Sequence, residues 1–187
     1  MKINFEYSLV YDMMLGEMMG SFDEKTEKDS RIYINSVRKF WDKKGARIIK
    51  EIENVSKLKF KRDVECFVVN SMFYESLSHP FTIKIEKDFD RLFAIFVHEL
   101  VHILLVQNFK KVAPLVNLID RDSNYRIHFP VLLIERKVLE KLNKSYKKQK
   151  RIEDLDYVWE DVDKMYSNFE RTNKGIVSFL KENVASR

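Results

Sequence analysis

The most apolar stretch of the chain is LFAIFVHELVHILLV, residues 92–106, and the fold is expected to form around it. These 15 residues include two histidines and a glutamate, which makes the stretch too short and too polar for a favourable bilayer span. We therefore expect a helix buried at the centre of a folded domain. Asp88 or Asp90 can cap its start, and the helix is expected to end near Asn108.

Short strands and amphipathic helices are predicted on both sides of this stretch. Apolar and polar residues alternate from Ile3 to Leu9, and two β-rich runs follow at 64–69 and 81–85. A long amphipathic helix is predicted over residues 30–56, another over 131–143 with Pro130 in its first turn, and further helical stripes over 155–169 and 176–180.

The expected fold class follows from this order of elements. It is α+β, a mainly helical domain with a small mixed β-sheet packed on the buried helix. The 187 residues contain only four glycines and three prolines, and no linker-like stretch interrupts them. We expect a single domain over residues 1–187, with an N-terminal lobe of about 1–108 and a helical C-terminal lobe of about 109–187.

Composition limits the compartment and the partners. The single cysteine, Cys66, cannot form an intramolecular disulfide and is expected to be a small buried strand residue. The first residues contain no uninterrupted apolar run typical of a signal peptide, so we expect a cytoplasmic protein without a membrane partner. The net charge of +5 does not by itself indicate nucleic acid.

A metal-site motif lies inside the apolar helix. His98 and His102 are four residues apart, which places both imidazoles on one face, about 40° apart around the axis and one turn apart along it. Neutral imidazole suits zinc, and Glu99 between them can accept a proton from a water whose pKa the ion lowers to about 7. Two histidines and a glutamate would be costly to bury in this helix without a partner, and a metal supplies one. Ordinary packing of the two histidines is the alternative.

The third ligand has to come from later in the sequence. On a helix that starts at Val131, the apolar residues cover an arc of about 160°, and Glu135 falls near its middle. A buried carboxylate there is expected to ligate the metal, the alternative being a buried salt bridge. Glu140 is expected to point to the opposite, charged side. Three more candidates downstream of His102 are Asp120, Asp122 and His128.

The segment from Val97 to Leu104 resembles the zincin metallopeptidases, whose zinc helix carries the same His-Glu-x-x-His pattern. The metzincin branch is excluded, because Leu105 and Asn108 stand where it needs a glycine and a third histidine. The chain looks like the minimal, single-unit gluzincins, in which a glutamate of a following helix is the third ligand. This resemblance implies a zinc peptidase with Glu99 as general base and with His98, His102 and Glu135 as ligands.

The resemblance also carries expectations about the surroundings of the metal. Zincins bind an extended peptide along the edge strand ahead of the zinc helix, so residues 81–85 are the candidate edge, with an interior strand as the alternative. Thermolysin-like members have an aspartate where Leu139 stands here, so support for a ligand would come from elsewhere, with Asp120 or Asp122 as candidates. A donor to the oxyanion is also needed, for which His128 is the first candidate and Tyr125 the second.

Two other functions compete with an active peptidase. One is a catalytically idle zincin-like module that binds a protein partner or nucleic acid through a basic run. An intact Glu99 argues against it, and a solvated helix end explains the same cations. The other is a latent enzyme whose C-terminal helices shield the site. The basic run consists of Arg136, Lys137, Lys141, Lys144, Lys147, Lys148, Lys150 and Arg151.

Overall fold

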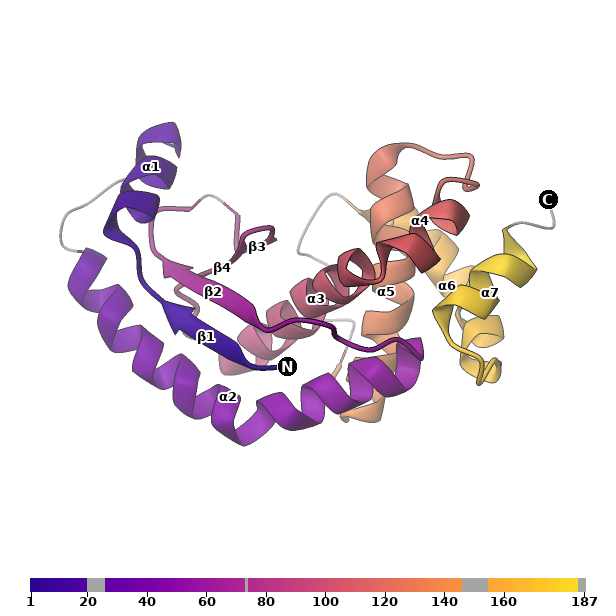
Figure 1. Cartoon of the computed structure of the whole chain (residues 1–187), viewed down its shortest axis with the longest axis horizontal. Helices are drawn as coiled ribbons and strands as arrows, with labels where there is room; N and C mark the ends of the chain where they lie inside the picture. Colours follow the sequence, from indigo (N-terminus) through magenta and orange to yellow (C-terminus); the bar gives the residue numbers. More distant parts are fainter. Residues whose placement is uncertain (20–25, 73, 146–154, 185–187) are drawn as a thin grey trace. The chain divides into compact units, whose positions relative to one another are not determined.

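The computed structural model describes residues 1–19, 26–72, 74–145 and 155–184. Over these residues it contains seven helices and four strands, which confirms the mainly helical α+β class (Figure 1). Contacts divide the chain into two compact units, one of residues 1–47 and 61–99 and one of residues 48–60 and 100–187. The predicted lobe boundary near residue 108 therefore lies inside the second unit.

The first unit is built on a mixed sheet in the order β1-β2-β4-β3. Its strands are β1 (Ile3–Glu6), β2 (Val64–Val69), β3 (Ser76–Ser78) and β4 (Phe81–Lys84). The pairs β1–β2 and β2–β4 are parallel, whereas β3 runs antiparallel to β4. The prediction of 81–85 as the edge is therefore wrong: β4 is interior, and the short β3, which sequence periodicity did not reveal, forms the edge.

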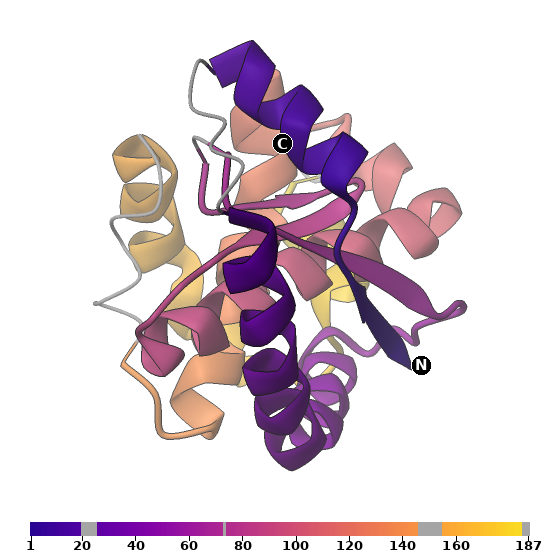
Figure 2. The ribbon, with the colours of Figure 1, turned by 90° about the vertical axis from the view of Figure 1, so that its left-hand side faces the viewer.

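Helices cover both faces of this sheet. Helix α1 (Leu9–Met19) lies on one face, where Tyr11 packs against Phe67 and its hydroxyl lies 3.1 Å from the Thr82 hydroxyl. Helix α2 (Thr26–Ser56) begins on the opposite side, as Figures 1 and 2 show. The start of α3 (Phe89–Gln107) joins α2 on that face.

Phe96 of α3 is the centre of the first unit's aromatic core. Its ring centroid lies 5.9 Å from that of Phe5 in β1 and 5.8 Å from that of Phe81 in β4. From α2, the Phe40 ring stacks on it at 5.9 Å, and the Trp41 ring lies at 5.0 Å with an interplanar angle of 36°. Since large aromatic rings dominate core energetics, this cluster holds the sheet, α2 and α3 together.

The second unit is helical. Helix α4 (Phe109–Val116) is followed by α5 (Ser123–Lys141), α6 (Asp156–Arg171) and α7 (Ile176–Asn183). Helix α5 packs on α6, and α4 packs on α7. The stripes predicted over 155–169 and 176–180 are confirmed as α6 and α7, and both bury their apolar residues.

Two helices of this unit differ from the sequence expectations. No helix was predicted directly after Phe109, but this segment forms α4 with Pro114 inside it. Helix α5 starts at Ser123, eight residues before the predicted start, because the Asp122 side chain caps it by accepting the Tyr125 N–H at 2.9 Å. Pro130 consequently lies inside the helix, where it removes one backbone donor without ending the helix.

No single helix of the described segments is long and apolar enough to cross a membrane, although α3 and α4 pass such a test as a pair bent by 98°.

Candidate metal centre

Helix α3 carries the predicted motif in an almost fully buried setting. The helix is capped by Asp88, whose Oδ1 accepts the backbone N–H of Asp90 at 2.8 Å and that of Arg91 at 3.3 Å. His98 is 5% exposed and Glu99 is 6% exposed. Polar side chains so deeply buried need polar partners or a metal.

Helix α5 supplies a further imidazole, that of His128. Its Nδ1 lies 2.9 Å from the backbone carbonyl oxygen of Asn124, one turn earlier in the helix. A neutral ring that donates from Nδ1 to this carbonyl presents the lone pair of Nε2 to a metal, which is how metal-ligating histidines are usually oriented. The Asp122 cap matters here, because it extends α5 far enough to place both His128 and its carbonyl acceptor in regular helix.

The three histidines form a group that could hold a metal ion. The rings of His102 and His128 lie 5.0 Å apart between centroids, with an interplanar angle of 83°. Ligand nitrogens of His98, His102 and His128 all lie within 4.8 Å of one another. Three imidazoles are a donor set suited to zinc and to several other transition metals, with an open position for water or substrate.

Glu135 is not a member of this group. The prediction that it is buried is confirmed, since it is 1% exposed. It stands seven residues after His128, which on a helix means nearly the same face but about 10.5 Å further along the axis. His128 thus stands where the sequence led us to expect Glu135, and a ligand role for Glu135 stays a prediction.

Two of the other carboxylates considered as ligands or supports, Asp122 and Glu140, have local roles. Asp122 caps α5 and also accepts a hydrogen bond from the Tyr157 hydroxyl at 3.2 Å, and these bonds lower the pKa of its carboxyl. Glu140, which was expected on the charged side of this helix, accepts Arg136 Nε at 3.2 Å and the Tyr166 hydroxyl of α6. Asp120 is exposed in the segment between α4 and α5.

Glu99 has a partner that sequence analysis missed. The hydroxyl of Ser76, on edge strand β3, donates to Glu99 Oε1 at 2.7 Å. Cys66 on β2 is buried as predicted, and burial together with the charge of Glu99 raises the pKa of its thiol well above the usual range. The thiol is therefore protonated. No sequence pattern links Ser76 to Glu99, because the contact is made only when β3 packs beside α3.

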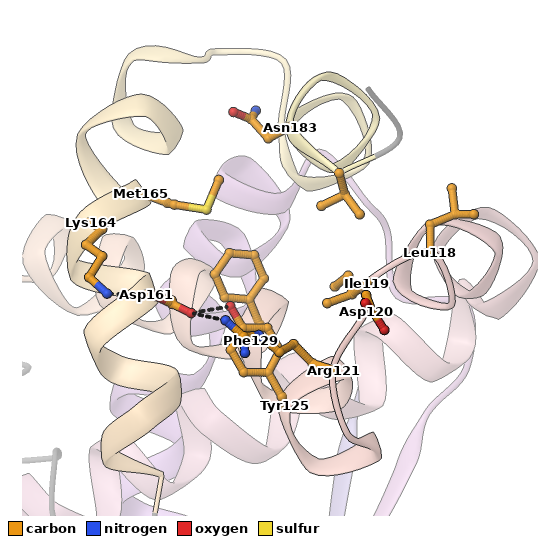
Figure 3. Close-up of a pocket in the computed structure, with 11 residues that line it drawn as sticks. Leu118, Ile119, Asp120, Arg121, Tyr125, Phe129, Asp161, Lys164, Met165 and Asn183 are labelled. Atoms are coloured by element: carbon orange, nitrogen blue, oxygen red, sulfur yellow. Dashed lines mark hydrogen bonds and ion pairs between the residues drawn. The ribbon is translucent and has the colours of Figure 1, made fainter. Parts of the chain in front are cut away.

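Tyr125, the second candidate for oxyanion stabilisation, is turned toward α6. Its hydroxyl donates to Asp161 Oδ2 at 3.1 Å, and its ring stacks on Phe129. Both rings lie against a pocket of about 690 Å³ within the helical unit, where Figure 3 shows Asp161 joined to Tyr125 and Arg121. The tyrosine thus belongs to the contact between α5 and α6.

The basic run is partly structural. Arg136 pairs with Asp163 at 2.6 Å, and its guanidinium carbon lies 3.7 Å from the centroid of the Tyr166 ring. Lys137 donates to the backbone carbonyls of Phe169 and Glu170 at the end of α6. These two cations join α5 to α6. Lys147, Lys148, Lys150 and Arg151 lie outside the described residues.

No known protein family, curated protein or solved structure matches this chain.

Proposed function

We propose that this protein is a zinc-dependent peptidase in which His98, His102 and His128 hold the metal and Glu99 is the general base. The observation that carries the proposal is the convergence of three imidazole nitrogens within 4.8 Å beside the glutamate of a His-Glu-x-x-His helix. A site that only binds metal does not need a buried carboxylate next to its ligands, whereas hydrolysis does.

Zinc would supply polarisation of the substrate carbonyl and a lower pKa for the attacking water. Glu99 accepts one proton of that water as the water oxygen bonds to the carbonyl carbon. The same carboxyl then gives this proton to the amide nitrogen as the carbon–nitrogen bond breaks, which yields a carboxylic acid and an amine. The remaining proton of the acid passes to the amine at neutral pH, so the products leave as a carboxylate and an ammonium group.

Edge strand β3 is the element that would align a peptide substrate. Strand β4 pairs antiparallel with one side of β3. Within the described residues β3 is the last strand of the sheet, so a further strand can add along its other side. An extended peptide adds to such an edge through main-chain hydrogen bonds. This assignment transfers the substrate-binding expectation from residues 81–85 to Ser76–Ser78.

The contacts of Arg136 and Lys137 weigh against the alternative, an idle module that binds nucleic acid. Arg136 and Lys137 are two of the four cations of the run that the structure describes; both are engaged with α6, and Arg136 is only 15% exposed. Phosphate contacts need cations that can reach the ligand.

Metal analysis combined with cleavage of a peptide library tests the proposal. We expect close to one zinc per chain and cleavage by the wild type, while Glu99→Gln keeps the zinc and loses most of the cleavage. A protein that takes up no zinc at neutral pH would refute the metal site. Equal cleavage by Glu99→Gln and wild type would refute the role of Glu99.

A further inference from the structure

The side chains of edge strand β3 alternate between two environments. Leu77 packs on the sheet face covered by α1, against a small core of Leu15, Val69 and Met72. Ser76, the preceding residue, therefore projects from the opposite face, where its hydroxyl reaches Glu99 of α3. This contact depends on the register of β3 against β4. A shift of the pairing by one residue would place the Leu77 side chain toward Glu99 instead.

The backbone that carries Ser76 is fixed from three directions. Glu75, its neighbour, forms an ion pair with Arg91 of α3, and the Glu75 carbonyl accepts the Lys84 N–H at 2.9 Å. At the start of the connection from β2, Asp12 Oδ1 accepts the N–H groups of Asn70 at 3.1 Å and Ser71 at 2.9 Å. The Ser76 hydroxyl is thus a donor held in place before any ligand arrives.

We propose that Ser76 is a positioning residue for the general base: its hydroxyl holds Glu99 by Oε1 and so fixes the plane of the carboxylate that receives the proton of the attacking water. The proposal rests on the function proposed above. A glutamate side chain has three rotatable bonds, and effective general bases must be held within hydrogen-bond reach of the proton they accept. A carboxylate accepts up to about four hydrogen bonds, so the bond from Ser76 is compatible with one from water.

A purely structural role makes a different prediction. If Ser76 served only to satisfy a buried carboxylate, its loss would lower stability and leave ligand recognition by the folded protein unchanged. If it orients the base, the folded and zinc-loaded variant would recognise poorly any ligand that must give a proton to Glu99.

Acetohydroxamate is the probe that separates these roles without a known substrate. It binds a metal ion through its two oxygens and gives its proton to a neighbouring carboxylate. Its affinity can be followed by the visible spectrum of the cobalt-substituted protein. The variants are Ser76→Ala, Ser76→Thr and Ser76→Val. Threonine and valine have the same shape and both suit a strand, but only threonine keeps the hydroxyl. Ser78→Ala, two residues along the same strand face, is the matched control.

We expect Ser76→Ala and Ser76→Val to bind one metal ion per chain with near-wild-type affinity but to bind acetohydroxamate roughly 10- to 100-fold more weakly, as for a lost hydrogen bond to a charged group. Ser76→Thr should stay within about threefold of wild type, Ser78→Ala should be unchanged, and Glu99→Gln should bind at least as weakly as Ser76→Ala. Wild-type acetohydroxamate affinity in metal-loaded Ser76→Val or Ser76→Ala would overturn the proposal. Failure of the wild type to bind any metal would instead refute the proposed function itself, and with it the role of Ser76.

Discussion

Replacement of His128 distinguishes the two possible third ligands. Zinc binding at a four-ligand protein site contributes about 10–16 kcal/mol, so one imidazole is worth roughly 3 kcal/mol. At about 1.4 kcal/mol for each factor of ten, His128→Ala should lower zinc affinity roughly 100-fold. Glu135→Gln should change it less than about threefold, because Glu135 stands about 10.5 Å along α5 from His128 and outside the group of three imidazoles.

A competition titration against a chromophoric zinc chelator measures both affinities, and far-ultraviolet circular dichroism checks that each variant is folded. His79→Ala is the control. His79 is exposed in the turn between β3 and β4, and of the four histidines of the chain it is the one outside the proposed site. Wild-type affinity in folded His128→Ala, together with a large loss in Glu135→Gln, would refute the imidazole assignment and restore Glu135 as the ligand.

Three further predictions concern stability. Phe96→Ala should lower the free energy of unfolding by about 3–5 kcal/mol in urea titrations, because the ring is fully buried among four aromatic neighbours, and a loss below about 1 kcal/mol would contradict its central place in the core. Burial raises the pKa of Tyr33 to about 12 from 10.0, so the folded state keeps a proton that the unfolded chain releases, and stability should fall as pH rises from about 10 to 12. Tyr33→Phe should show a smaller fall in its unfolding midpoint over that range, and an equal fall would contradict the assignment. Arg136→Ala should lower stability by about 1–2 kcal/mol through loss of its contacts with α6, whereas the exposed Lys141→Ala should be neutral, and equal effects would contradict the structural role of Arg136.

The parts of the fold with strong periodicity could be predicted from the sequence. The apolar stretch around His98 gave α3, its cap at Asp88 and its burial, because an apolar run of this length has few other solutions in a folded domain. The strands β1 and β2 were found from alternation and β-branched residues. Edge strand β3 has only three residues, too few to show a period.

The site could be predicted only as far as one helix determines it. His98, Glu99 and His102 are brought together by helical spacing alone, so the sequence was sufficient. The place of His128 depends on where α5 begins, and Pro130 favoured a start that the Asp122 cap moves eight residues earlier. Ser76 reaches Glu99 through packing of a strand on a helix, and no local pattern encodes such a contact.

Zinc K-edge X-ray absorption of the zinc-loaded protein tests the metal centre most directly. Multiple scattering from the rings counts the imidazoles bound to the metal. The proposed site predicts three imidazole nitrogens at about 2.0–2.1 Å and one or two oxygens from water. A protein that takes up no zinc, or a spectrum with two imidazoles and a carboxylate, would contradict the assignment of His98, His102 and His128 as the ligands.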